Sequence, residues 1–298
     1  VVHQLVRVYV DDELIYEFGY NDKRLFGKTP GCAWLYVNIT PEMSGKTCRI
    51  DIEGVYNKDY SMKMRQVYYG GKNSINSYIL FSRFSSWCIS VLLFSAGLLV
   101  FVCCILFKNP LFKSLRRLSL LTILMSIWSG FLTGIYQLII GNTYQLINAE
   151  FISFSLLVPC GLYFFRSLKI YKDDKIMEFM LYESLLQGAV LNLLQFFNVC
   201  DYMISITATH IMMFVVLIYL VLLTIKLRVK KENGSTAMLL SMIILATLAI
   251  LDIFGFYLLP HSDEGFFVRI GLLIFIIIWA VSTMREVSSI ISEQTEKE

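Results

Sequence analysis

Long apolar stretches restrict this chain to a small set of folds. A helix needs about 20 apolar residues to cross the hydrocarbon core of a bilayer, and seven stretches of the 298-residue chain reach or approach that length. They are residues 84–107, 118–140, 151–165, 184–200, 202–225, 236–259 and 265–284. The sequence therefore predicts a bundle of seven transmembrane helices; six is the alternative, if the fourth and fifth stretches form a single span.

Composition excludes several classes of protein. Charged residues make up only 16% of the chain, against roughly 25% in an average soluble protein. This excludes a disordered chain, a coiled-coil rod and an ordinary cytosolic enzyme. The net charge is only +3, so we expect no nucleic-acid partner, and the expected surroundings of the apolar stretches are membrane lipid.

Lysine and arginine gather in every second connecting loop. The loops after the first, third and fifth apolar stretches contain Lys108, Lys113, Arg116 and Arg117, then Arg166, Lys169, Lys172 and Lys175, then Lys226, Arg228, Lys230 and Lys231. The intervening loops contain no lysine or arginine. Cytoplasmic loops carry the excess of these residues, so the pattern predicts an extracytoplasmic N-terminus, a cytoplasmic C-terminus and an odd number of spans.

The first 78 residues have a different, period-two pattern. Alternation predicts strands at 5–10, 14–18, 34–39, 47–52 and 64–69, because side chains of a strand point to opposite faces in turn. Five short strands in so few residues predict a small all-β extracytoplasmic domain of the sandwich or jelly-roll type. The chain starts within a strand, so we expect this domain to be truncated. The organisation is then 1–78 for the β domain, 79–284 for the seven-helix domain and 285–298 for the start of a cytoplasmic signalling helix.

Three motifs of the β domain point to a family. They are Phe26-Gly27-Lys28-Thr29-Pro30-Gly31-Cys32-Ala33-Trp34, the turn Pro41-Glu42-Met43-Ser44-Gly45-Lys46, and Tyr68-Tyr69-Gly70-Gly71 before the first span. With these motifs and seven spans, the chain resembles bacterial seven-transmembrane receptors with diverse intracellular signalling modules, notably membrane-bound diguanylate cyclases of Gram-positive gut bacteria.

That resemblance implies a bacterial plasma-membrane protein with an extracytoplasmic jelly roll, seven helices and a signalling helix that leads to a cytoplasmic output domain. The sequence contains no GGDEF output domain. Cyclic di-GMP synthesis would therefore belong to residues outside this chain, and we expect no catalytic residue within it.

Aromatic side chains of the β domain are candidate ligand contacts. The heads of the family look like carbohydrate-binding modules, which implies sugar stacking on Trp34, Tyr36, Tyr9 and Tyr16. The alternative is that these residues fill a small sandwich core, since aromatic residues favour strands. Cys32 and Cys48 enclose 15 residues and either form a disulfide, which an outer compartment permits, or are buried as small apolar residues.

Polar residues inside the spans form a second candidate site. A charged group in hydrocarbon costs about 2.5–3.5 kcal/mol, so such residues need a partner or a function. The candidates are His210, Asp252, Arg269, Asn192, Gln195 and Gln137. At 1.5 Å per residue, their distances from the outer loops place them in the outer half of the membrane. Either Asp252, Arg269 and His210 exchange partners in a ligand pocket or switch, or the whole layer is a static clasp between helices.

The last apolar stretch continues as a polar helix, with Met284, Val287 and Ile291 at heptad-like spacing. It either pairs with a second copy in a parallel homodimer or frays. His3, His210 and His261 are scattered, and no CxxC or HxxxH spacing occurs, so we expect no metal and no cofactor. We predict a membrane sensory receptor for an unknown small-molecule or carbohydrate ligand; a small-molecule transporter or channel is the main alternative, and a membrane enzyme is a third.

Overall fold

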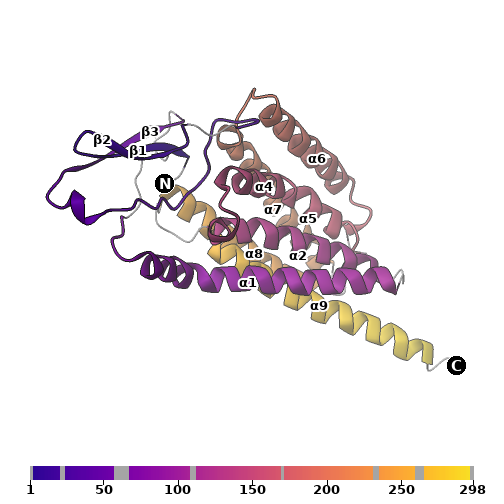
Figure 1. The fold of residues 1–298 in the computed structure, drawn as a ribbon. Coiled ribbons are helices and arrows are strands. Elements are labelled where there is room, and N and C mark those ends of the chain that lie inside the picture. The colour runs from indigo at the N-terminus through magenta and orange to yellow at the C-terminus, as the bar shows by residue number, and fades with distance from the viewer. Residues whose placement is uncertain are drawn as a thin grey trace.

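The computed structural model describes residues 3–20, 24–56, 67–107, 112–168, 171–230, 235–258 and 265–295. These residues form a mostly helical chain with a small sheet near the N-terminus. The helices lie together as a bundle, the sheet lies beside one end of it, and the C-terminal part of the last helix extends beyond the other end (Figure 1).

The sheet contains three antiparallel strands in the order β2-β1-β3. Its strands are β1 (Gln4–Val10), β2 (Glu13–Phe18) and β3 (Cys48–Gly54). Val6, Val8 and Val10 on one face of β1 are almost fully buried, as the alternating pattern requires of a half-buried strand. The central strand β1 pairs with β3 along its whole length and with β2 over Val6–Val10, so β1 is the strand that connects the other two.

The structure confirms three of the five predicted strands and corrects the others. Residues 34–39 form no strand, because the backbone of Trp34 is hydrogen-bonded to a helix side chain rather than to a strand. Of the fifth predicted strand, residues 64–66 lie outside the described part of the chain and residues 67–69 are irregular. The described residues therefore show a three-stranded sheet, and the sandwich or jelly roll stays a prediction.

The apolar stretches form helices, with boundaries that differ from the expected ones. In chain order the helices are α1 (Lys72–Leu106), α2 (Lys113–Leu132), α3 (Gln137–Ile140), α4 (Thr143–Ser155), α5 (Leu157–Phe165), α6 (Lys175–Phe196), α7 (Tyr202–Val229), α8 (Ser235–Leu258) and α9 (Phe266–Thr295).

Two predicted spans are interrupted for identifiable reasons. The second ends at Leu132, where Gly134 adopts a left-handed conformation with φ +71 that glycine takes without strain. The third starts earlier than expected, at Thr143, and breaks near Leu156. Pro159 has no N–H to donate to the carbonyl four residues before it, which weakens the helix at this point.

Among the described residues, five helical segments are long and apolar enough to cross a membrane. They are Lys72–Leu106, Lys113–Leu132, Thr143–Phe165, Tyr202–Val229 and Thr236–Gly255. The apolar part of α9, Phe266–Ser282, is shorter, and the apolar sequence of α6 is interrupted by Glu183, Gln187, Asn192 and Gln195. A multi-pass membrane protein is thus supported, whereas the count of seven spans stays a prediction.

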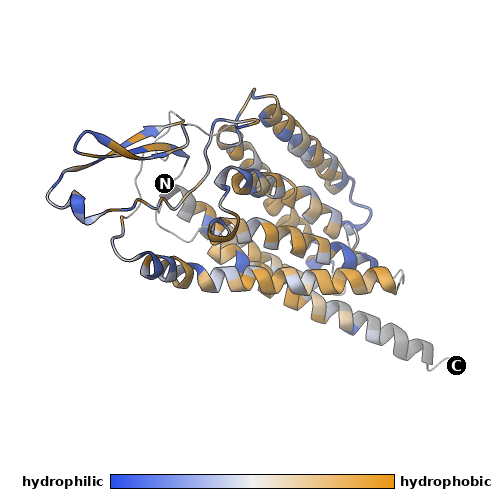
Figure 2. Ribbon diagram, in the orientation of Figure 1, coloured by the Kyte–Doolittle hydropathy of each residue, from blue (hydrophilic) through white to orange (hydrophobic). Residues whose placement is uncertain are grey.

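The outer surface of the bundle is apolar. Hydrophobic residues run along most of the length of the helices (Figure 2), and side chains such as Leu99, Ile211 and Leu222 are 60–66% exposed. A surface of this kind suits lipid rather than water. Inside, one large core cluster joins residues of α1, α2 and α5–α9, including Leu93, Phe164 and Phe275.

Close packing of α1 on α2 gives a prediction. A Cβ atom at Gly97 would lie 3.1 Å from Cγ1 of Ile123 and 3.3 Å from its backbone N, whereas a Cβ at Gly161 would meet nothing within 4 Å. Gly97→Leu should therefore force α1 away from α2 and destabilise the bundle by about 1–3 kcal/mol. Gly161→Leu is the matched control and should be neutral, because leucine favours helix. Thermal unfolding in detergent measures the difference, and an equal loss in both variants would contradict this packing.

Candidate functional site

The described residues before α1, hereafter the β head, include a segment with two glycines that lies against the end of the bundle next to the sheet. Residues 26–34, hereafter the docking segment, follow β2 and form no helix or extended ladder. Its backbone polar groups still need partners, and side chains from α3, α4 and the α6–α7 turn provide them. The chain after β2 can be followed in Figure 1 as it crosses from the sheet to the end of the bundle.

Two bundle side chains each bind both polar groups of one residue in the docking segment. The Trp34 N–H donates to Oε1 of Gln137 at 2.8 Å, and Nε2 of Gln137 donates back to the Trp34 carbonyl at 2.9 Å. The Tyr144 hydroxyl accepts from the Phe26 N–H at 3.0 Å and donates to the Phe26 carbonyl at 2.8 Å. Both ends of the segment are thus anchored to the bundle.

Three further side chains hold the middle of the docking segment. The Gly27 N–H donates to Oδ1 of Asn198 at 2.5 Å, and the Lys28 N–H donates to Oδ2 of Asp201 at 2.7 Å. The Thr143 hydroxyl donates to the Pro30 carbonyl at 2.9 Å. The bond to a carboxylate is of the stronger, charge-assisted kind.

The glycines of the docking segment permit this close approach. Gly27 has φ +76, and a Cβ there would lie 2.0 Å from Nε2 of Gln195; Gly31 has φ +99, and a Cβ there would lie 2.6 Å from the Thr143 carbonyl oxygen. Both positions combine a left-handed backbone with contact against a bundle atom, so glycine fits them and a larger residue does not.

The docking segment is also tied to the central strand of the sheet. The His3 N–H donates to the Gly31 carbonyl at 3.1 Å, and Nδ1 of His3 lies 2.6 Å from Oγ1 of Thr29. Because β1 begins at Gln4, the docking segment connects the central strand of the sheet to the bundle.

A small core cluster provides a second connection between the head and the bundle. Tyr56, just after β3, packs with Ile147, Phe151, Tyr202 and Met203 of α4 and α7. The Phe151 and Tyr202 rings are stacked with centroids 5.1 Å apart. The head is therefore held by apolar contacts as well as by hydrogen bonds.

Two of the predicted polar residues, Gln137 and Gln195, lie against the docking segment, and Asn192 lies near Gln195 on α6. Gln137 binds Trp34 directly, and Gln195 lies below Gly27 while its Oε1 accepts from the Tyr202 N–H at 2.7 Å. Asn192, one turn before Gln195 on α6, accepts from the Tyr202 hydroxyl at 2.6 Å and donates to the Ser155 hydroxyl at 3.0 Å. Together they join α6 to the start of α7 and the end of α4.

Two others lie at a separate junction between helices. Oδ2 of Asp252 on α8 accepts from the Val268 N–H at 2.5 Å, in the first turn of α9, where an anionic group is favoured by the helix dipole. Arg269 is 1% exposed and its Nη2 donates to the Ser129 carbonyl of α2 at 2.9 Å. The Ser129 and Ser90 hydroxyls are 3.0 Å apart, so this junction extends from α8 through α9 and α2 to α1.

His210 on α7 makes an aromatic contact instead. Its ring meets the edge of the Phe154 ring at a centroid distance of 5.4 Å, and Phe154 lies 5.4 Å from Trp128 of α2. The six predicted residues thus occupy two hydrogen-bonded groups and one aromatic contact. An exchange of partners among Asp252, Arg269 and His210 stays a prediction.

The predicted aromatic ligand contacts occupy two different settings. Trp34 and Tyr36 are half-buried, and the Tyr36 hydroxyl donates to Oδ1 of Asn76 on α1 at 2.9 Å. Tyr9 lies on the sheet with the Arg49 guanidinium 4.5 Å from its ring centroid, and Tyr16 pairs with Val8 across β1 and β2. A sugar would have to displace Arg49 to stack on that face of Tyr9, and sugar binding stays a prediction.

The cysteines of the head behave differently from both expectations. Neither Cys32 nor Cys48 is in a disulfide, and both are exposed. Burial as small apolar residues is therefore wrong. Within the described part of the chain, no group of three or more histidine, cysteine and acidic side chains is placed to hold a metal ion.

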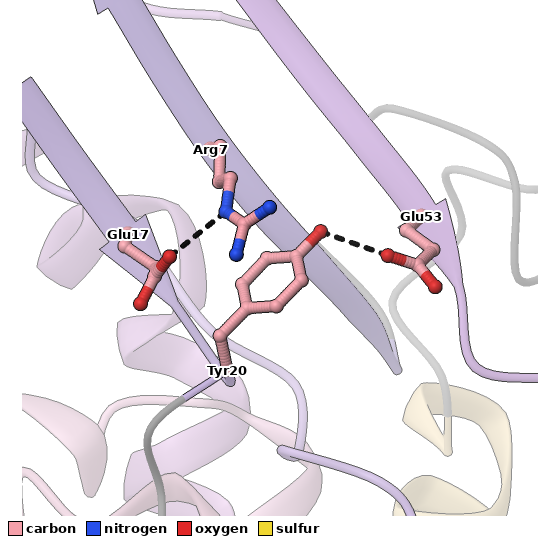
Figure 3. Close-up of polar contacts among 4 residues, drawn as sticks. All are labelled: Arg7, Glu17, Tyr20 and Glu53. Carbon is pink, nitrogen blue, oxygen red and sulfur yellow. Dashed lines mark hydrogen bonds and ion pairs between the residues drawn. The ribbon is translucent and has the colours of Figure 1, made fainter. Parts of the chain in front are cut away.

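A polar cluster on the sheet joins all three strands (Figure 3). Nε of Arg7 lies 2.8 Å from Glu17, and its guanidinium carbon lies 3.7 Å from the centroid of the Tyr20 ring. The Tyr20 hydroxyl donates to Oε2 of Glu53 at 3.0 Å. The hydrogen bond to Glu17 raises the pKa of Arg7, and partial burial followed by the bond to Glu53 raises the pKa of Tyr20.

Gln137 and Gln195 are among the predicted polar residues, whereas four other residues that hold the docking segment were not predicted. These are Thr143, Tyr144, Asn198 and Asp201. They are ordinary polar residues of short loops or helix ends, so no pattern in a single sequence distinguishes them. The sequence feature that could have indicated this interface is in the docking segment itself, in the glycines and proline of residues 26–34.

Comparison with known proteins agrees with the fold. Residues 144–285 match the family model described as 7TM diverse intracellular signalling. The match supports the family that the sequence motifs indicated and suggests a membrane sensory receptor. No curated protein and no solved structure matches the chain. The matched region contains Tyr144, Asn198 and Asp201, whereas Gln137, Thr143 and the docking segment precede it.

The contact at Gly27 gives a prediction with a matched control. Gly27 and Gly45 both have positive φ, but a Cβ at Gly45 would meet nothing within 4 Å. Both Gly→Ala variants incur backbone strain of roughly 1 kcal/mol, and only Gly27→Ala also forces apart the docking segment and Gln195. Gly27→Ala should therefore lower the melting temperature more and speed cleavage of residues 24–36 by a protease. Equal behaviour of the two variants would show that the segment does not lie against Gln195.

The Tyr20 cluster predicts a pH dependence. The pKa of Tyr20 is raised in the folded head, so the folded state keeps this proton when the unfolded state begins to lose it near its ordinary pKa of about 10. The contribution of Tyr20 to the stability of the folded head is complete below a pH of about 10. It is lost as the pH rises through the pKa that Tyr20 has in the folded state. Tyr20→Phe should reduce the fall in melting temperature between about pH 9 and about pH 11. Tyr69→Phe, at a side chain that is 93% exposed, is the control and should leave that fall unchanged.

Proposed function

We propose that the chain is a sensory receptor in which the β head receives an extracytoplasmic signal and the helical bundle conveys it to a cytoplasmic output domain. The observation that carries the proposal is the docking segment, whose backbone is held by five bundle side chains. These are Gln137, Thr143, Tyr144, Asn198 and Asp201. A change in the head that moves this segment must also move the helix ends that hold it.

The distribution of charge supports the orientation. The sheet lies beside one end of the bundle (Figure 1), and Lys113, Arg166, Lys175 and Lys226 lie at or next to the ends of α2, α5, α6 and α7 that face away from it. An excess of lysine and arginine marks the cytoplasmic side. The head is then extracytoplasmic, and α9 begins near the head and ends beyond the opposite face of the bundle.

The hydrogen bonds offer a route from the docking segment to α9. Gln137 starts α3, one short turn after the end of α2 at Leu132, and the Ser129 carbonyl of α2 accepts from Arg269 of α9. A shift of the outer end of α2 would therefore alter the position or rotation of α9. Such a route becomes a switch if this junction has two arrangements that the signal favours differently.

The output and the ligand follow from the family resemblance. We propose a GGDEF-type diguanylate cyclase after α9, a homodimer through the C-terminal helix, and a small-molecule or carbohydrate signal. A transporter or channel is the weaker proposal, because the family match points to signalling.

Separation of two labels at the cytoplasmic end tests the coupling. Gln137→Leu combined with Tyr144→Phe removes both anchors of the docking segment. Nitroxide labels at Met284→Cys on α9 and Lys226→Cys on α7, both at exposed positions, should then show a shifted or broadened distance distribution in a cysteine-free full chain in nanodiscs. Glu53→Gln, which changes the sheet but not the docking segment, is the control. An unchanged distribution in the double variant would refute coupling, and the full reading frame should show altered cyclic di-GMP synthesis in the same variant.

A further inference from the structure

A groove opens at the end of the bundle that faces away from the sheet (Figure 1). It has a volume of about 1000 Å³ and lies between α2, α5 and α6. Because α5 packs against both α2 and α6, α5 forms its floor. The walls are apolar over most of their length, with Leu120 and Leu124 from α2, Pro159 and Cys160 from α5, and Leu181 and Leu185 from α6.

The mouth of the groove is strongly basic. Its cations are Lys113, Arg117, Arg166, Lys172 and Lys175, against the two carboxylates of Asp173 and Glu178. One of these carboxylates is already engaged, since Glu178 lies 3.2 Å from Nη2 of Arg166. The mouth therefore keeps an excess of positive charge that no acidic residue lining the groove balances.

One cation is held in a fixed orientation at the mouth. The Arg117 guanidinium lies 3.6 Å from the centroid of the Tyr163 ring, and its Nη1 donates to the Tyr163 carbonyl at 2.9 Å. Arg117 and Lys113 also belong to the first turns of α2, which contain no acidic residue and no side-chain cap. A helix N-terminus favours anions over cations, so an anion at this position relieves an unfavourable arrangement.

The dimensions of the groove match one leaflet of a bilayer. The apolar walls extend about ten residues from the cations on each helix, from Lys113 to Leu124, from Arg166 back to Leu156, and from Lys175 to Leu185. At 1.5 Å per residue this is about 15 Å, or half of the roughly 30 Å hydrocarbon core. A soluble anion would fill only the mouth, whereas the apolar part has the length of an acyl chain.

We infer that this groove binds an anionic phospholipid, with its phosphate among Lys113, Arg117, Lys172 and Lys175 and an acyl chain along α5. Basic pockets between transmembrane helices suit such headgroups on the cytoplasmic side. The inference rests on the multi-pass assignment and on the orientation proposed above, and it does not depend on whether the chain is a receptor. A lipid in this position would be in contact with α2, α5 and α6 together, and so would stabilise their spacing.

Lipid titration of the full chain tests this site. The detergent-purified protein is titrated with phosphatidylglycerol and with phosphatidylcholine of the same acyl chains, and bound lipid is counted by native mass spectrometry. We expect one phosphatidylglycerol to bind preferentially. The double variant Lys172→Gln with Lys175→Gln should weaken the binding of phosphatidylglycerol by about fivefold per cation removed. Lys226→Gln with Arg228→Gln, at exposed positions of α7 outside the groove, is the charge-matched control and should bind as the wild type.

A second variant separates lipid from a simple anion. Leu120 is 40% exposed, so Leu120→Trp fills the groove without a change of charge or of the core. This variant should weaken the binding of phosphatidylglycerol. Inorganic phosphate at millimolar concentration should not compete with the lipid for the wild-type protein. Equal binding of phosphatidylcholine, an equal loss in the control pair, or wild-type lipid binding by Leu120→Trp would each overturn the inference, as would competition by inorganic phosphate.

Discussion

The contact between the β head and the bundle depends on hydrogen bonds to the backbone of the docking segment. A stretch without regular secondary structure must find partners for its N–H and C=O groups, and here the partners are side chains of the helical bundle rather than a neighbouring strand. Each such bond contributes a net 0.5–1.5 kcal/mol or so, because water can replace it. The hydrogen bonds together hold the head firmly, although each one is weak. This suits a contact that must keep the head in place and still change when the head changes.

Polar residues in the bundle extend this contact inward. Gln195 supports both Gly27 and the first turn of α7, and Asn192 links Tyr202 to Ser155. Arg269 links α9 to α2 at the other junction. Buried polar groups in a membrane are expensive unless they are hydrogen-bonded, so these bonds fix the relative positions of the helices. The same bonds would have to break and re-form in any rearrangement.

The sequence predicted the helices better than the head. Apolar stretches of about 20 residues have few folding alternatives, and they appear as helices, with changed ends where Gly134 and Pro159 interrupt them. The alternation at residues 34–39 was misleading, because Trp34 is bound to Gln137 and a partner on a distant helix leaves no trace in local periodicity. The spans could be searched for polar residues, and Gln137 and Gln195 were found in this way, but their contacts with Trp34 and Gly27 could not be predicted from the sequence.

Hydrogen exchange of the docking segment tests the central claim most directly. In the full chain in nanodiscs, the amides of Phe26, Gly27, Lys28 and Trp34 are each bonded to a bundle side chain, so a peptide spanning residues 24–36 should exchange slowly. Removal of the Gln137 and Tyr144 anchors should bring its exchange close to that of the exposed turn around Gly45. Fast exchange of this peptide in the unaltered protein would contradict the account, because the head would then not be docked on the bundle.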